Sequence, residues 1–317
     1  MQTKDTSLTG NAQQIINQVR KAVVGKDTVL LWVLAAILAR GHILLEDIPG
    51  VGKTTMALAF SRVLDLSYSR MQFTPDVLPS DVTGYTIPNP ANGELHYKPG
   101  AVLCNLFLAD ELNRATSRTQ SALLEAMEEG QVTVDGISHE LPQPFTVIAT
   151  QNPTGAAGTS LLPDSQMDRF MVRLSLGYPS PKDEMAMVLN RQAGNPLHSL
   201  HPLMTRQQLT ELQDCVAETF VSEPIVHYIV TLVGATRQSD LLIQGASPRA
   251  TLAVTAMAKA VARLRGRDYV VPGDVREVFV HTVSHRLLLS PKAEAQGLTS
   301  EQILRNILER TDAPKLR

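Results

Sequence analysis

One short segment, Pro49-Gly50-Val51-Gly52-Lys53-Thr54, constrains the fold of this chain more than any other. The apolar residues 42–45 precede it and favour a buried strand, and the pattern over residues 54–64 favours a helix. A glycine-rich loop between a strand and a helix is typical of phosphate-binding loops, whose backbone N–H groups hold phosphate oxygens. The chain is therefore expected to fold around this strand–loop–helix unit.

The residues of this loop have separate expected roles. Lys53 is expected to reach the β- and γ-phosphates of ATP, and the Thr54 hydroxyl is expected to bind Mg²⁺. The generic pattern begins with a glycine five residues before Gly52, whereas this chain has Asp47 there. The other residues of the loop expected to hold the nucleotide are Pro49, Gly50, Val51, Gly52 and Thr55.

The rest of the first half of the chain predicts an α/β fold. Apolar runs at 103–109, 145–150 and 171–176 predict buried strands, and they alternate with helical patterns. Such alternation favours a parallel sheet that is covered on both faces. Asp135-Gly136 between residues 131–134 and 137–140 predicts a two-residue hairpin turn.

The second half of the chain has a different pattern. After Tyr178-Pro179-Ser180-Pro181, strand-like runs become scarce and helical patterns take over. We therefore predict a nucleotide-binding α/β domain over residues 1–179 and an all-helical lid domain over residues 180–317. A length of 317 residues also suits two domains.

Composition narrows the class of protein. The formal net charge of −2 and the absence of a run of basic residues disfavour a dedicated nucleic-acid surface. The longest apolar run, residues 29–39, is too short for a membrane span, which needs about 20 residues. The N-terminus lacks signal-peptide order, and Cys104 and Cys215 lack metal-type spacing. We expect a cytoplasmic protein with free thiols.

Two acidic residues, Asp110 and Glu111, follow the apolar run that ends at Ala109. Ligands of open parallel sheets bind at the carboxyl ends of the strands, so both acids are expected there. Asp110 is expected to hold Mg²⁺ through water, and Glu111 to orient and deprotonate the attacking water. The alternative is an acid pair that simply favours the N-terminus of a helix.

Three further polar residues are candidates for the same reaction. Asn152 follows the strand at 145–150 and is expected to position the water or sense the γ-phosphate; the alternative is a turn-forming Asn before Pro153. Arg169 precedes the last strand, and Arg249 lies in the first turn of a helix opened by Ser247-Pro248. A cation there opposes the helix dipole, which hints at a function. The alternative for each arginine is a surface or ion-paired side chain.

In this order, the motifs resemble those of the AAA+ ATPases, and in detail those of the MoxR family. The resemblance covers roughly residues 20–290. The segments that carry it are Phe73-Thr74-Pro75-Asp76, Leu78-Pro79-Ser80-Asp81 with Thr83-Gly84, Asp110-Glu111 with Asn113-Arg114-Ala115, residues 119–129 (TQSALLEAMEE), 149–153 (ATQNP), Asp168-Arg169-Phe170 and 246–250 (ASPRA).

The resemblance implies roles position by position. Lys53 and Thr54 resemble the Walker A pair, and Asp110 and Glu111 the Walker B pair. Asn152 resembles sensor 1, Arg249 resembles sensor 2, and Arg169 resembles the arginine finger that acts on the neighbouring subunit's ATP. The remaining positions are Val24 and Gly25, in a segment that resembles the one whose backbone meets adenine.

The resemblance also implies an assembly and two insertions. The insertions span about residues 73–100 and 131–141, and such insertions usually contact partners or line the centre of a ring. The expected protein is a hexameric ATPase that uses ATP, ADP and Mg²⁺ to remodel, assemble or activate a client, often one with a von Willebrand A domain.

Three other functions are weighed against this one. A DNA motor of the helicase type has similar insertions, but the net charge and the missing DNA-binding appendage disfavour it. A GTPase should carry a guanine-reading Asn-Lys-x-Asp, which this chain lacks. A metabolic kinase should carry an acceptor pocket for a small molecule, and the predicted all-helical second domain gives no sign of one.

Overall fold

The computed structural model describes residues 5–90, 93–151, 162–192 and 194–315. Its centre is a five-stranded sheet in the order β2-β5-β8-β1-β9, and all its neighbouring strands are parallel. Every one of these strands except β2 overlaps an apolar run that the sequence identified. The five strands are β1 (Ile43–Glu46), β2 (Tyr68–Gln72), β5 (Leu106–Asp110), β8 (Thr146–Gln151) and β9 (Val172–Leu174).

Alternate residues of these strands enter two separate hydrophobic clusters. In β1, Ile43 and Leu45 face the larger cluster, and Leu44 faces the smaller one. The larger cluster contains residues of α1, α2 and α3, and it continues into the helices of the second half of the chain. The smaller cluster lies against α5. Helices therefore cover both faces of the sheet, as the sequence predicts, and these helices are α1 (Asp5–Val19), α2 (Asp27–Leu38), α3 (Lys53–Val63) and α5 (Ser117–Glu129).

Two strands differ from the sequence prediction, one in where it begins and one in having been missed. The strand predicted from residue 103 begins at Leu106, because the Asn105 side chain binds Ser67 and the Pro144 carbonyl in a buried loop. β2 was not predicted, because its sequence YSRMQ has no apolar run and no residue of the strand is fully buried. The Thr116 side chain caps the N-terminus of α5, where its hydroxyl accepts a hydrogen bond from the N–H of Thr119.

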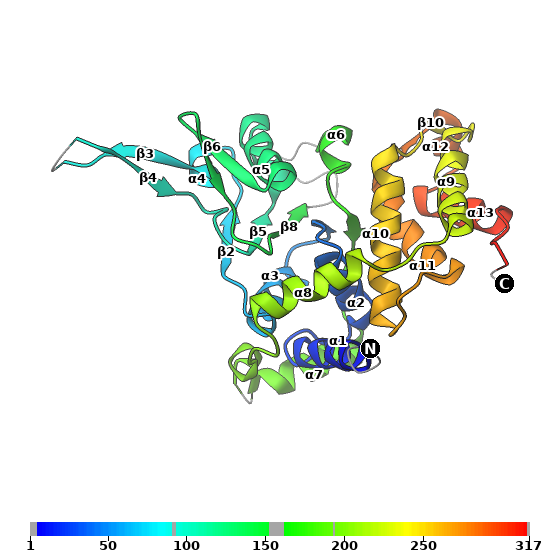
Figure 1. Ribbon diagram of the computed structural model, residues 1–317, viewed down its shortest axis with the longest axis horizontal. Helices are drawn as coiled ribbons and strands as arrows, with labels where there is room; N and C mark the ends of the chain where they lie inside the picture. The colour runs from blue at the N-terminus through cyan, green and yellow to red at the C-terminus, as the bar shows by residue number, and fades with distance from the viewer. Residues whose placement is uncertain (1–4, 91–92, 152–161, 193, 316–317) are drawn as a thin grey trace.

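Both predicted insertions contain a hairpin. The first contains α4 (Pro79–Thr83) and the antiparallel pair of β3 (Gly84–Pro88) and β4 (Leu95–Pro99), which projects away from the sheet (Figure 1). The second is the predicted hairpin of β6 (Gln131–Val134) and β7 (Ile137–Glu140).

The two hairpins are in contact with each other. The Tyr97 ring of β4 stacks on the His139 ring of β7 with 3.6 Å between the ring centroids. The Thr86 hydroxyl of β3 donates a hydrogen bond to Asp135 in the turn of the other hairpin. The two insertions therefore form one surface.

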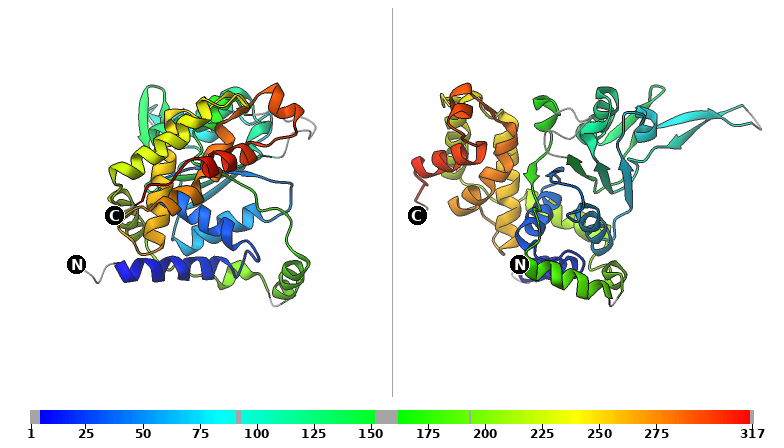
Figure 2. Two further views of the ribbon diagram at one scale, coloured as in Figure 1. Left: turned by 90° about the vertical axis from the view of Figure 1, so that its right-hand side faces the viewer. Right: turned by 180° about the vertical axis from the view of Figure 1, so that it is seen from behind.

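The second half of the chain is helical and packs against α2 and β9. Two short antiparallel strands, β10 (Leu242–Gln244) and β11 (Leu288–Leu289), add to the predicted helices. Figure 2 shows the C-terminal helices grouped at one side of the sheet, with α1 and α7 along one edge of the molecule. The helices are α7 (Pro181–Gln192), α8 (Arg206–Ala217), α9 (Glu223–Arg237), α10 (Pro248–Leu264), α11 (Pro272–Val283), α12 (Pro291–Ala295) and α13 (Ser300–Arg310).

The described part of the chain also contains four short helical segments. Three are 3₁₀ helices and one is the α-helix that precedes Asp168 and Arg169: Leu112–Arg114, Pro196–Ser199, Ser284–Arg286 and α6 (Asp164–Met167). Cys104 and Cys215 are free thiols, as predicted. Among the described residues, no helix combines the length and the apolar character needed to cross a bilayer. The division into domains at residues 179 and 180 stays a prediction.

Candidate active site

The glycine loop connects β1 to the N-terminus of α3, as the sequence predicts. Gly50 and Gly52 have φ values of 88° and 101°. A residue with a side chain would be strained in this left-handed conformation, whereas glycine adopts it readily. Among the described residues, no side chain caps the start of α3, so its first N–H groups stay open to a ligand. An open helix N-terminus preceded by left-handed glycines favours phosphate oxygens.

Lys53 lies under this loop and is 7% exposed. Its Nζ donates a hydrogen bond to the main-chain carbonyl of Asp47 at 2.8 Å. Burial lowers the pKa of Lys53, and the nearby carboxylates of Asp47, Asp110 and Glu111 partly offset that effect. The structure therefore brings the predicted lysine to both predicted acids.

Asp47, which departs from the generic loop pattern, is buried, and its carboxylate accepts several hydrogen bonds. Its carboxylate accepts from the Ser175 hydroxyl at 2.7 Å and from the backbone N–H groups of Leu176 and Gly177 at 2.6 and 3.0 Å. These donors follow β9 directly. Asp47 therefore fastens the phosphate loop to the segment that leaves the sheet toward α7.

Asp110 ends β5 at the carboxyl edge of the sheet, where the sequence predicts it. Its Oδ1 accepts a hydrogen bond from the Thr150 hydroxyl at 2.7 Å, and its Oδ2 lies 2.7 Å from Nη2 of Arg70. A carboxylate and the hydroxyl of Thr54 are hard oxygen donors, which suit Mg²⁺. The residues therefore fit the expected metal. Arg70 is a contact of Asp110 that no sequence pattern predicted.

Glu111 has a φ of 56°, which is uncommon for a residue with a side chain. Its N–H donates to the Thr150 hydroxyl at 2.8 Å, and its Oε2 lies 2.9 Å from Nη1 of Arg114. Strained backbone of this kind is often found at functional sites. Thr150 thus orders both acids, a role that the sequence did not reveal because threonine is common in strands.

A cavity of about 170 Å³ lies beside the loop. Gly50, Gly52 and Thr55 line it together with Val24 and residues of α7. Gly25 has a φ of 72°, and a side chain there would collide with Asp183. The predicted adenine-binding segment therefore shares one cavity with the phosphate loop.

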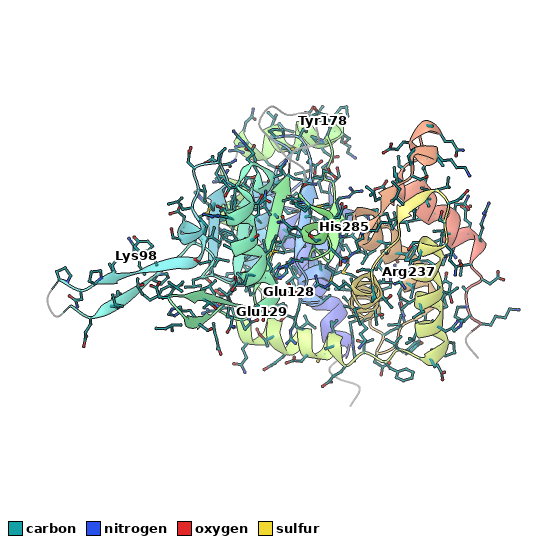
Figure 3. The ribbon with its side chains drawn as sticks, turned by 90° about the horizontal axis from the view of Figure 1, so that it is seen from above. Lys98, Glu128, Glu129, Tyr178, Arg237 and His285 are labelled. Atoms are coloured by element: carbon teal, nitrogen blue, oxygen red, sulfur yellow. The ribbon has the colours of Figure 1, made fainter. Side chains whose placement is uncertain are left out.

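The two predicted arginines lie together in a different place. Glu128 binds both: its Oε2 is 3.0 Å from Nη1 of Arg169, and its Oε1 accepts a hydrogen bond from Arg249. A second cavity, lined by these three residues, shares none of its described lining residues with the cavity at the phosphate loop. Figure 3 shows Glu128 well separated from Tyr178, the residue before Pro179 of the first cavity.

Contacts of Asp168 hold together the segments that carry these arginines. Asp168, next to Arg169, accepts a hydrogen bond at 2.9 Å from the hydroxyl of Ser247, the N-cap of the helix with Arg249. Asp168 also pairs with the buried Arg286. Asn152 lies outside the described residues.

Comparisons with known proteins agree with this geometry. A family model described as "ATPase family associated with various cellular activities (AAA)" matches residues 42–172, and a model described as "AAA lid domain" matches residues 234–307. Chaperone MoxR1 of Mycobacterium tuberculosis is 38% identical over 313 residues, which cover 96% of this chain and 82% of MoxR1. The chain belongs to the MoxR family of AAA+ ATPases.

Other relatives support this assignment to the MoxR family. YeaC of Bacillus subtilis is 44% identical over 97% of this chain and 95% of its own length. A crystal structure of a protein from Cytophaga hutchinsonii superposes with a TM-score of 0.91 at 36% identity and covers 98% of this chain and 97% of that one. The predicted fold class, MoxR resemblance and ATPase activity are thus confirmed.

Proposed function

We propose that this MoxR-family ATPase performs Mg²⁺-dependent hydrolysis of ATP to ADP at sites that two neighbouring subunits complete in a hexameric ring. One observation carries the proposal: Lys53, Asp110 and Glu111 meet at one site, while Arg169 and Arg249 lie at another cavity. Phosphoryl transfer needs positive charge near the transferred group, and an arginine from a second protein can supply it. Another copy of the chain would do so here.

Each residue then has a role in this composite site. Lys53 and the backbone N–H groups of residues 50–55 would bind the phosphates. Val24, which lines the cavity, and the adjacent Gly25 would border adenine. Thr54 and, through water, Asp110 would hold Mg²⁺, which would offset charge on the phosphates when bound. Glu111 would orient the attacking water and accept its proton.

The remaining roles concern the neighbouring subunit and the lid. Arg169 and Arg249 would contact the ATP of the next subunit, and Asn152 would act as sensor 1. Loss of the γ-phosphate would shift the lid, residues 180–317, against the α/β domain, residues 1–179. Asp47 lies where such a shift would act, because it ties the loop to the segment after β9.

This cycle would remodel, assemble or activate a client protein in the cytoplasm. A relative is named Chaperone MoxR1, which supports a chaperone-like role. The two hairpins offer exposed apolar side chains, among them Leu95 and Ile137, as contacts for a client. A client with a von Willebrand A domain is our first candidate.

The direct test is the ATPase rate per subunit as a function of protein concentration, with Mg²⁺ and with excess EDTA. We expect the rate to rise with concentration as rings assemble and to disappear with EDTA. A rate per subunit that is constant from dilute monomer to assembled protein would refute the shared site. Turnover that persists in EDTA would refute the Mg²⁺ requirement.

A further inference from the structure

Glu128 occupies an unusual position between two arginines that are far apart in the sequence. It lies in the last turn of α5, whereas Arg169 follows α6 and Arg249 belongs to the first turn of α10. Each carboxylate oxygen binds a different guanidinium group. A single acidic side chain thus joins the two arginines that the proposed function needs.

The backbone near the two arginines is fixed without Glu128. The Asp168 carboxylate binds the Ser247 hydroxyl and Arg286, which holds the two segments side by side. The side chains are less constrained, because 49% of the Arg249 side chain is exposed. Its guanidinium makes no hydrogen bond or ion pair to a described residue other than Glu128. The direction of Arg249 therefore depends on this carboxylate.

Charge explains why one carboxylate is useful there. Two guanidinium groups at one site repel each other, and a shared carboxylate offsets that repulsion. Arg169 uses Nη1 for both Glu128 and the Leu124 carbonyl, while its buried Nε makes no hydrogen bond to a described group. A guanidinium has five N–H donors, so both arginines keep donors for phosphate oxygens.

We propose that Glu128 is a positioning residue that presents Arg169 and Arg249 as a pair to the phosphates of the neighbouring subunit's ATP. This inference rests on the proposed function, because it requires that the arginines act across a subunit contact. Glu128 itself touches neither nucleotide nor metal in this account. Its removal should affect turnover on the neighbour while leaving the subunit's own phosphate loop intact.

The test uses Glu128→Gln, which keeps the size of the side chain and removes its charge. Glu129→Gln is the matched control, because Glu129 is exposed beside it on α5 and pairs with no described residue (Figure 3). We expect Glu128→Gln to lower kcat about 10- to 100-fold, as misplaced catalytic groups do, with KM for ATP and melting temperature close to wild type. Glu128→Asp, which keeps the charge, should retain more activity.

Mixing experiments separate this role from a structural one. Glu128→Gln subunits keep a working phosphate loop, and Lys53→Ala subunits keep a working pair of arginines. A mixture of the two should therefore regain turnover. The inference is overturned if Glu128→Gln behaves like Glu129→Gln, or if mixing rescues Arg169→Ala but not Glu128→Gln. If the proposed function is wrong, the ATPase rate per subunit of the wild-type protein will instead be independent of protein concentration.

Discussion

The substitution Asp47→Ala tests whether the buried carboxylate holds the phosphate loop in place. Asp47 is 5% exposed and accepts three hydrogen bonds from residues 175–177. Alanine would leave the N–H groups of Leu176 and Gly177 without an acceptor, whereas the Ser175 hydroxyl can turn to water. An unpaired buried donor costs about 1–3 kcal/mol, and water reaches Gly177 more readily than Leu176, so the total loss should be about 2–4 kcal/mol.

The assay is thermal unfolding, with Ser175→Ala as the graded control. At about 2 °C per kcal/mol for a chain of this size, Asp47→Ala should lower the melting temperature by about 4–8 °C. Ser175→Ala removes one of the three hydrogen-bond donors and leaves the Asp47 carboxylate with two. It should therefore lower the free energy of unfolding by about 1 kcal/mol. A melting temperature of Asp47→Ala that stays within about 1 °C of wild type would refute the reasoning.

Two further substitutions test other parts of the structure. Burial lowers the pKa of His42 to about 4, while its ring binds the Met127 carbonyl and the Val147 N–H. Below about pH 6.5, His42 takes up a proton in the unfolded chain but not in the folded one. This difference should lower the free energy of unfolding by about 2 kcal/mol between pH 7 and pH 5. In urea titrations, the free energy of unfolding of His42→Gln should fall correspondingly less than that of wild type between these pH values. An equal fall in both proteins would contradict this. Glu111→Gln should still bind ATP but stop turnover, and near-normal turnover would show that Glu111 is not the general base.

Local sequence was sufficient to predict the centre of the site. The phosphate loop, β1 and α3 are adjacent in the chain, so their glycines, lysine and apolar residues carry the signal directly. Asp110 could be predicted because an apolar run leads up to it, and this run forms the buried strand β5 that Asp110 ends. The same reasoning missed β2, whose polar residues fit the edge of a sheet.

Contacts between distant residues could not be predicted from the sequence. Arg169 and Arg249 meet only because α10 packs beside the segment after α6, and Glu128 reaches them from a third element. Asp47 was recognised as a departure from the generic loop, but its partners after β9 emerge only from the parallel pairing of β1 and β9. Such interactions depend on tertiary packing rather than on local propensity.

The central claim is that two subunits share each ATPase site, and mixing two inactive variants tests it most directly. Arg169→Ala subunits keep the phosphate loop, and Lys53→Ala subunits keep the arginines. If subunits mix at random in equal amounts, roughly a quarter of the contacts between subunits join an intact loop to intact arginines. We predict that the mixture regains measurable turnover although neither variant has it alone. Mixed assemblies that stay as inactive as the separate variants would contradict the account.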